Sequence, residues 1–333
     1  MSVVFEFEAG KGFHFTSAFA KRFDSMATND RVFLPDTLGE GFIQEVYLPN
    51  GLSLCLHHYT LHQEFILRRH GTGATEVLTM KFDGRRKAVQ PKEGSRESLF
   101  AAGKGYEVEF GTSNFFAEVR IPPNEEINFL VIVITRQSLL DLLQIKEEGR
   151  AIEDTIRNNP SFLIHEAMTG EMARTLKQLC AINQTTKLPD LLYQTRAQEL
   201  IYFLFVRLFS RRTGSSIVID PEDVKKIYEV RASILADLSS PPQLPELARK
   251  AGMSSTKMKQ LFRQIFGDSI YNYFQIERMN EAAQLLRDLS VSQVGYRIGF
   301  SNLSHFTRVF EKHHQIKPKR YKNMLGEVSL ENS

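Results

Sequence analysis

Several features that mark other classes of protein are scarce or absent in this sequence of 333 residues. Its two cysteines, Cys55 and Cys180, form neither a disulfide framework nor a CxxC metal pair. Its longest apolar run, Phe129 to Ile134, is far shorter than the ~20 residues of a membrane-spanning helix. The N-terminus lacks the basic region of a secretory signal. We therefore expect a cytoplasmic protein that does not bind membranes.

Motifs of the common enzyme classes are missing as well. There is no nucleophile elbow, no P-loop and no dinucleotide-binding fingerprint. His57, His58 and His62 lie near Cys55, and imidazole and thiolate are good metal ligands. However, His57 and His58 would point to opposite faces of a strand, and the three histidines do not follow the metal-binding pattern of cupins. The sequence therefore predicts no enzyme, no catalytic residue and no bound metal.

Charge is distributed unevenly, although the formal net charge is only +3. From Pro221 to Ser333 the chain has 17 Lys and Arg against 12 Asp and Glu, which gives +5. The remainder has 42−17=25 basic and 39−12=27 acidic residues, which gives −2. A basic C-terminal part is compatible with a partner that carries phosphate groups.

The region from Arg31 to about Thr135 has the pattern of many short strands. Val108 and Phe110 alternate with Glu107 and Glu109, as in a strand with one buried face. Asn50-Gly51 and Asp83-Gly84 are typical turns. These features predict a small barrel or sandwich. The expected strands are Phe42–Leu48, Leu52–Leu56, Glu76–Phe82, Tyr106–Phe110, Phe115–Ile121 and Ile127–Ile134.

After Gln137 the apolar residues follow a helical period. Met168–Ile182 and Leu191–Phe209 are the longer expected helices. The stretch Leu191–Leu208 has more apolar surface than one helix needs within its own domain. Two interpretations remain open for it, a contact between two copies of the chain and an ordinary core helix.

The sequence thus predicts an α+β protein with two main domains. Arg211–Ser216 is polar, rich in Gly and Ser, and the best candidate for a linker. We expect a sensor domain over residues 1–136, a helical dimerisation and linker region over 137–216, a DNA-binding domain over 217–326, and a tail over 327–333.

Two segments near the C-terminus have the pattern of a helix-turn-helix. In the first, Leu247 and Ala248 pack a short helix, and Gly252 gives room for a sharp turn. Ser254 can cap the next helix. That helix has one apolar face and one small, polar and basic face, which suits entry into the major groove of DNA. Its expected DNA-binding residues are Ser255, Thr256, Lys259, Gln260 and Arg263.

The second segment repeats this plan. Val294 and Ile298 make its first helix apolar, Gly299 makes the turn, and Ser301 is the expected N-cap. Arg308 is the best candidate for a contact with guanine or phosphate. The expected DNA-binding residues of this segment are Asn302, Ser304, Thr307 and Arg308.

The connection between the two segments has no internal Gly or Pro from Ser269 to Asp288. As a helix, these 20 positions would span about 30 Å, which is close to the ~34 Å between successive major-groove faces of B-DNA. The pattern therefore predicts a rigid helix that places both segments on one side of the duplex.

From Asp220 to Asn323 these residues resemble the AraC/XylS family of transcription regulators. The chain departs from the family pattern at Val294-Gly295, where Ile-Ala is usual, and at His314-Gln315, where Phe-Gly is usual. Gly295 should weaken its helix by about 0.5–1 kcal/mol relative to Ala. The matching residues are Leu247, Ala248, Ser254, Phe262, Phe266, Gly267, Tyr273, Arg278, Met279, Ala283, Leu285, Leu286, Gly299, Phe300, Ser304, Phe306, Phe310, Pro318 and Tyr321.

The resemblance implies a cupin-like β-barrel sensor followed by dimer-forming helices. It also implies double-stranded operator DNA, RNA polymerase and a second copy of the chain as partners, with activation favoured over repression. Lys257–Arg263 and Leu34–Gln44 look like PchR-like regulators, which sense ferric siderophores. The implied effector is therefore a small molecule, with a ferric siderophore as one candidate, and no cofactor is expected.

The basic pairs Arg68/Arg69 and Arg85/Arg86 could meet an anionic ligand, although solvated turns would explain them equally well. Two other functions also remain open at this stage. One is a cupin-type metal enzyme fused to a DNA-binding domain. The other is an architectural DNA binder without a ligand.

Overall fold

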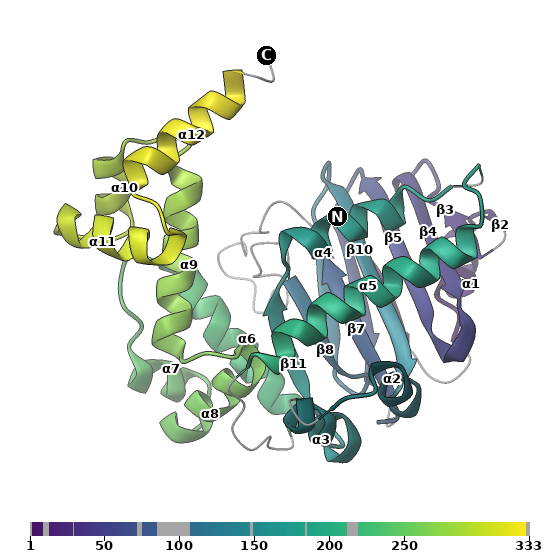
Figure 1. Cartoon of the computed structure of the whole chain (residues 1–333). Helices are drawn as coiled ribbons and strands as arrows, with labels where there is room; N and C mark the ends of the chain where they lie inside the picture. The colour runs from purple at the N-terminus through teal and green to yellow at the C-terminus, as the bar shows by residue number, and fades with distance from the viewer. Residues whose placement is uncertain are drawn as a thin grey trace. The chain divides into compact units, whose positions relative to one another are not determined.

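The structure, a computed structural model, describes residues 2–8, 13–28, 30–71, 75–84, 107–146, 149–183, 185–211 and 219–330. The chain divides into two compact units (Figure 1). The N-terminal unit comprises Met1–Lys225 with Gln264–Gly267, and the C-terminal unit comprises Lys226–Arg263 and Asp268–Ser333. Most of the expected linker, from position 212 onward, lies outside the described residues.

A large antiparallel sheet organises the N-terminal unit. Each strand alternates between its two faces, so the sheet supports a separate apolar core on each side. In spatial order its eight strands are β11 (Leu163–Ala167), β8 (Glu107–Thr112), β7 (Val77–Asp83), β10 (Glu126–Thr135), β5 (Ser53–Leu61), β4 (Gly39–Tyr47), β3 (Arg31–Phe33) and β2 (Ala27–Thr28).

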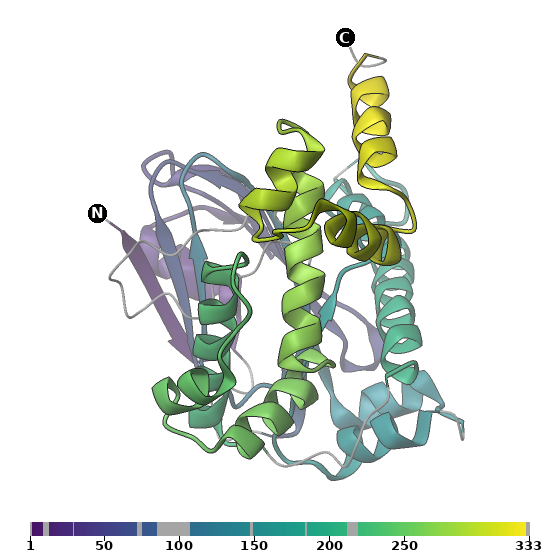
Figure 2. The ribbon, with the colours of Figure 1, turned by 90° about the vertical axis from the view of Figure 1, so that its left-hand side faces the viewer.

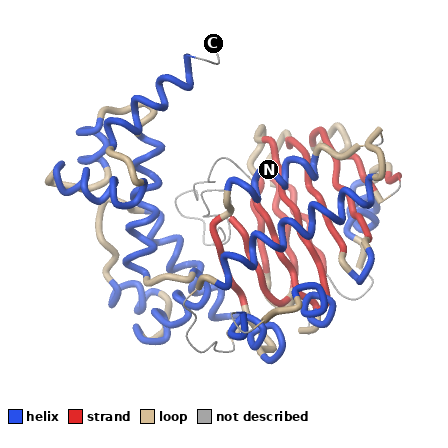
Figure 3. Tube along the Cα trace, viewed as in Figure 1, coloured by secondary structure: helices blue, strands red, loops and turns tan. Residues whose placement is uncertain are grey.

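Helices cover one face of the large sheet, as the blue segments over the red strands show in Figure 3. Thr135 and Thr169 cap two of them by accepting hydrogen bonds from Ser138 N and Met172 N. Leu200 and Leu204 of the longest helix are fully buried in the core that includes Met80 and Ile132 of the sheet. The four helices of the described region between residues 136 and 209 are α2 (Arg136–Leu143), α3 (Arg150–Asn158), α4 (Gly170–Cys180) and α5 (Pro189–Phe209).

A second, smaller sheet contributes to the core on the other side of the large sheet. Its central strand β6 (Phe65–His70) pairs in parallel with β1 (Val3–Glu8) and antiparallel with β9 (Ala117–Ile121). Helix α1 (Phe15–Phe23) joins this core, in which Phe rings from β1, α1 and β10 pack together. A short 3-10 helix, η1 (Pro49–Gly51), connects β4 to β5.

The expected strand-rich domain is confirmed, but closure of a barrel is not shown, because the described strands pair into two separate sheets. The expected strands correspond to β4, β5, β7, β8, β9 and β10, with shifted ends. The sequence interpretation missed β1, β6 and β11 together with α1 and α3. Tyr106, the expected start of β8, lies outside the described residues.

The C-terminal unit is helical, and α9 is the light-green helix in the middle of Figure 2. Helix α9 has 16 residues, so it is about 24 Å long rather than the expected 30 Å. Ser269 caps its N-terminus, and the chain leaves the helix before Asp288. The helices of this part are α6 (Pro221–Ala236), α7 (Leu244–Lys250), α8 (Ser255–Phe266), α9 (Ile270–Leu285), α10 (Val291–Arg297), α11 (Leu303–His314) and α12 (Pro318–Leu330).

Turns at Gly252, Gly299 and Gln315 in this unit adopt left-handed backbone conformations. Gly299 has φ +80°, and a Cβ atom there would lie 1.9 Å from the carbonyl oxygen of Ser239. Only glycine therefore fits this turn. Gln315 ends α11 with φ 59°, and its N–H donates to Glu311 O. The turn thus forms although the usual glycine is absent.

Candidate DNA-binding surface and ligand pocket

The first helix-turn-helix consists of α7 and α8. Ser254 accepts a hydrogen bond from the N–H of Lys257 at 3.2 Å, which confirms it as the cap of α8. Met258 and Leu261 point into the core of the unit and are buried. All five candidate residues lie outside this core: Thr256, Lys259, Gln260 and Arg263 are exposed, and Ser255 is half-buried.

The second helix-turn-helix consists of α10 and α11. The expected N-cap Ser301 is wrong, because the side chain of Asn302 accepts from Ser304 N and His305 N and α11 begins at Leu303. Asn302 Oδ1 is therefore engaged within the helix terminus, which leaves its NH2 group for an outside partner. Asn302, Ser304 and Arg308 are exposed, and Thr307 is half-buried.

Gly295 has a packing role that the sequence interpretation did not anticipate. It is buried in α10, and a Cβ atom there would lie 2.6 Å from Leu303 Cδ2 and 3.1 Å from Phe306 Cδ1. Glycine thus allows close approach of α10 and α11. The expected weakening of the helix is accompanied by closer packing between the two helices.

Helix α9 is joined to α6 through a buried polar contact. Arg231 Nε donates to the hydroxyl of Tyr273 at 2.7 Å, and the ring of Tyr273 packs edge-on against Phe262 of α8. Because buried Arg is stable only when its donors are satisfied, this contact fixes α6, α8 and α9 together. The exposed residues of α8 are thereby held on a rigid support.

Comparison with known proteins agrees with the assignment of helix-turn-helix segments in this part of the chain. Residues 247–324 match the family described as "Helix-turn-helix domain". Residues 247–324 of the chain thus form a domain of this type.

Individual relatives match parts of this chain. The Xylose operon regulatory protein of Escherichia coli is 24% identical over 128 residues, which are 38% of this chain and 32% of the relative. This chain thus spans about a third of the length of that relative. Multiple antibiotic resistance protein MarA of Escherichia coli is 28% identical over 109 residues, 32% of this chain and 86% of MarA. Regulatory protein PchR of Pseudomonas aeruginosa is 36% identical over 66 residues, 20% of this chain and 22% of PchR.

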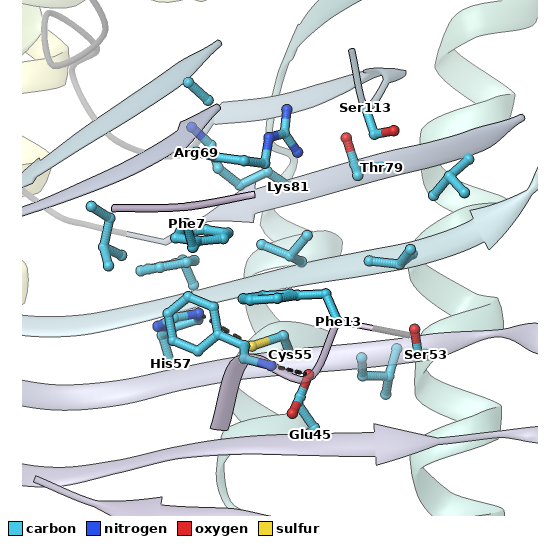
Figure 4. Close-up of a pocket in the computed structure, with 18 of the residues that line it drawn as sticks. Phe7, Phe13, Glu45, Ser53, Cys55, His57, Arg69, Thr79, Lys81 and Ser113 are labelled. Atoms are coloured by element: carbon cyan, nitrogen blue, oxygen red, sulfur yellow. Dashed lines mark hydrogen bonds between the residues drawn. The ribbon is translucent and has the colours of Figure 1, made fainter. Parts of the chain in front are cut away.

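The N-terminal unit contains a cavity of about 370 Å³ lined by strands of both sheets and the segment before α1. Its volume lies within the ~300–1,000 Å³ range of small-molecule sites. Figure 4 shows Arg69, Lys81, Thr79 and Ser113 gathered toward one end and Glu45, Cys55 and His57 toward the other, with the rings of Phe7 and Phe13 between them. The chain therefore has a second candidate site besides its helix-turn-helix segments.

Burial suppresses the ionisation of His57 and Cys55. Desolvation lowers the pKa of His57 to about 3, so its ring is neutral near pH 7. The ring stacks on Phe129 with centroids 3.9 Å apart, and its Nε2 lies 3.4 Å from Cys55 Sγ. Burial, with nearby Glu45, also raises the pKa of the Cys55 thiol well above its ordinary value. The Cys55 side chain is therefore a thiol near pH 7 and is not prepared for nucleophilic attack.

Of the three clustered histidines, only His57 lines the cavity. His58 faces the opposite side of β5 and contacts Asn128 Oδ1 at 2.6 Å, while His62 is exposed. Within the described ranges no group of three or more His, Cys, Asp or Glu side chains is arranged to hold a metal ion. Across the same ranges no helix is long and apolar enough to cross a membrane.

The basic pairs of the sequence interpretation have different environments. Arg68 forms ion pairs with Glu6 and Glu118, both at 2.8 Å, and does not line the cavity. Arg69, its neighbour in β6, does line the cavity. Arg85 and Arg86 lie outside the described residues. The basic pair in the sequence included Arg69, which lines the cavity. No sequence pattern pointed to Phe7 or Phe13 as lining residues, and the strand β1 that contains Phe7 was not recognised.

Proposed function

We propose that this chain is a sequence-specific DNA-binding transcription regulator controlled by a small ligand. The observation that carries the proposal is the pair of capped helices α8 and α11, each exposing a polar and basic face from a helix-turn-helix. Lys259 and Gln260 can bond base edges, and Arg263 can bind phosphate. Arg308 is proposed to contact guanine or phosphate from the second unit.

Helix α9 supports a site that extends over two adjacent major grooves. Its length of about 24 Å is shorter than the ~34 Å between successive groove faces. The helix-turn-helix units at its ends must supply the remaining separation, or the DNA must bend toward the protein. We propose two half-sites on one face of the duplex.

The domain organisation proposed for the chain is a sensor over residues 1–136, a helical region over 137–216, a DNA-binding domain over 217–326 and a tail over 327–333. A match of 109 residues covers 86% of MarA, which supports the proposal that a domain of this size can stand alone. The proposed output is activation through RNA polymerase in the cytoplasm.

The ligand proposed for the N-terminal unit is a small molecule, with a ferric siderophore as one candidate. The short match to PchR and the resemblance of Leu34–Gln44 support that candidate. Leu34–Gln44 comprises the turn after β3 and the first part of β4, and its residues do not line the cavity. The support for iron therefore comes from similarity, and the support for a ligand comes from the cavity.

A homodimer is proposed through the outer side of α5. Leu191, Tyr202, Val206 and Phe209 are exposed and fall on one face of this helix, opposite the buried Leu200 and Leu204. A second copy of the chain could bury this apolar face in an isologous contact. The inner face of α5 is therefore part of the core of its own unit. We propose the contact between two copies of the chain for the outer face of α5.

Genome-wide mapping of DNA bound by the tagged full-length chain tests the central proposal. We expect discrete operators, footprints over two half-sites, and affinity that falls steeply with salt because counterions are released from phosphates. A Lys259→Ala, Arg263→Ala, Arg308→Ala variant should lose these sites, whereas the matched variant Lys250→Ala on exposed α7 should keep them. A folded wild-type protein that binds operators and random duplex equally would contradict the proposal.

A fragment of residues 217–326 tests the domain boundaries. It should fold alone and protect the same operator as the full chain. A fragment that folds but binds the operator no better than random DNA would contradict the assignment of this region as the complete DNA-binding domain.

A further inference from the structure

We propose that the cavity of the N-terminal unit binds a small organic acid whose carboxylate pairs with Arg69 and whose apolar, aromatic body lies among the phenylalanine rings. This inference rests on the proposed function, in which the N-terminal unit senses a ligand. It adds the chemical class of that ligand, its orientation in the cavity and the residue that selects it.

The guanidinium group of Arg69 is desolvated, and its Nε is buried without a hydrogen-bond partner within the described part of the chain. Its Nη2 donates to the carbonyl oxygen of Phe115 over a long distance of 3.4 Å. Glu109, which pairs with Lys81, also attracts this charge. Desolvation lowers the pKa of Arg69, which is the physical sign of an incompletely compensated cation.

Arg68, the neighbour of Arg69 in β6, shows how carboxylates neutralise an arginine in this strand. Arg68 points to the other side of β6 and forms 2.8 Å ion pairs with both Glu6 and Glu118. Arg69 has donors of the same fork geometry but faces the cavity, where a bidentate carboxylate could satisfy them. The unmet donors of Arg69 thus point to an external anion.

The cationic end of the cavity has a net charge that favours an anion. Lys81 Nζ is 2.8 Å from Glu109 Oε2, across the paired strands β7 and β8. Glu109 also attracts Arg69, so two cations share one carboxylate and a positive charge remains at this end. Thr79 adds a hydroxyl group beside it, which can donate to or accept from a ligand oxygen (Figure 4).

The opposite end of the cavity repels a second anion. Glu45 lies there and accepts hydrogen bonds from Phe15 N at 2.9 Å, Thr16 N at 3.1 Å and Thr16 Oγ1 at 2.6 Å. These three donors fix the position of its carboxyl group in the cavity wall. His57 beside it is neutral and offers no compensating positive charge. A dianion with charges at both ends is therefore disfavoured, and a monoanion has one orientation.

The middle of the cavity defines the body of the ligand. Phe7 and Phe13 stack with centroids 5.3 Å apart, and Phe15 and Phe129 also line the wall. Such a wall favours a flat, apolar group through burial and ring stacking. The cavity volume of about 370 Å³ has room for one small aromatic acid.

This chemistry could come from a free acid or from an acid bound to iron. Both present an anionic aromatic group, so the experiment must separate them. Suitable probes are 4-phenylbutyrate and 2-naphthoate, each compared with its primary amide. A third probe, 3-hydroxy-2-naphthoate, chelates Fe³⁺ through its carboxylate and phenolate and can be added with or without the metal.

Binding to the full-length protein is measured by isothermal titration calorimetry and by thermal shift. We expect the acids to bind about tenfold or more tightly than their amides, because a charge-assisted bidentate pair is lost in the amide. Arg69→Met should abolish this preference and Arg69→Lys should retain part of it. Arg174→Met, on the exposed surface of α4, is the matched control and should bind like wild type.

A second measurement separates loss of binding from loss of folding. Arg69→Met removes a desolvated cation, so its thermal midpoint without ligand should not fall below that of wild type. Tighter binding of 3-hydroxy-2-naphthoate with Fe³⁺ would identify an iron chelate as the source, and tighter binding without Fe³⁺ would identify a free acid. Either result supports the anion site.

Three results would overturn the inference: equal binding of acids and amides, unchanged acid binding by a folded Arg69→Met variant, or no binding of any acid at millimolar concentration. Operator footprints are recorded on the same protein samples. Retained footprints without acid binding would reject only this inference, whereas lost footprints in the wild type would reject the proposed function.

Discussion

Arg278 of α9 donates a hydrogen bond from Nε to the carbonyl oxygen of Ile298 at 2.6 Å, just before the turn of the second helix-turn-helix. Its guanidinium group also lies 4.0 Å from the ring centroid of Phe300, and Nη2 reaches Ser239 O at 3.4 Å. Burial lowers the pKa of Arg278, but an arginine stays protonated at neutral pH. This buried cation fixes the connecting helix to the second DNA-binding unit.

The first prediction concerns this anchor. Arg278→Met should destabilise the C-terminal unit by about 1–3 kcal/mol, because the buried carbonyl oxygen of Ile298 loses its donor. Thermal unfolding of the full-length chain and operator affinity measure the effect. Arg287→Met, an exposed change just beyond α9, is the control and should stay within about 0.5 kcal/mol of wild type. Equal unfolding of both variants would show that the anchor is dispensable.

The second prediction separates the two recognition helices. Lys259→Ala and Arg308→Ala should each weaken specific binding by about 1–3 kcal/mol if they read bases. Each should alter the footprint in a different half-site, roughly one helical turn apart. Lys250→Ala, paired with Glu246 on α7, serves as the control. Wild-type footprints and discrimination in both variants would show that the faces are assigned incorrectly.

The third prediction concerns assembly through α5. Tyr202→Glu with Val206→Glu should give a folded monomer, because these side chains are 63% and 46% exposed and the new charges would face the second copy. Sedimentation gives the mass and circular dichroism reports folding. Met26→Glu, an exposed apolar site on another element, should leave assembly unchanged.

The inner face of α5 provides the opposite test. Leu200→Glu with Leu204→Glu should unfold the N-terminal unit, because both positions are fully buried and the charges would have no partner. A folded monomer from this inner pair, or a dimer from the outer pair, would reverse the assignment of the two faces.

The fourth prediction is a pH dependence that arises from His57. Its pKa is about 3 in the folded state and 6.5 ordinarily, so the unfolded chain binds the proton first as the pH falls. Stability is therefore complete above about pH 6.5 and should fall by about 2 kcal/mol between pH 7 and pH 5. Denaturant unfolding at each pH measures this loss.

His57→Gln should flatten that slope, because glutamine does not titrate. His62→Gln, a change at an exposed position, is the matched control and should keep the wild-type slope. An unchanged slope in His57→Gln would show that another group governs the acid sensitivity.

The sequence by itself determined the two helix-turn-helix units. Their signals are local: Ser254 caps the helix that follows it, the turn before Phe300 requires a glycine, and apolar residues repeat at helical spacing. Each of these depends on neighbours within one or two helical turns. The cap of α11 was misplaced by one residue because Ser301 and Asn302 are both good caps and only the backbone geometry selects Asn302.

Only the tertiary structure showed which residues line the cavity of the N-terminal unit and which face of α5 is buried. Phe7 and Arg69 are far apart in the sequence but lie side by side in paired strands β1 and β6. Similarly, Arg68 and Arg69 look equivalent in the sequence. Because side chains alternate along β6, Arg68 pairs with Glu6 and Glu118, whereas Arg69 faces the cavity with an unpartnered Nε. Such differences depend on long-range strand pairing, which no local pattern specifies.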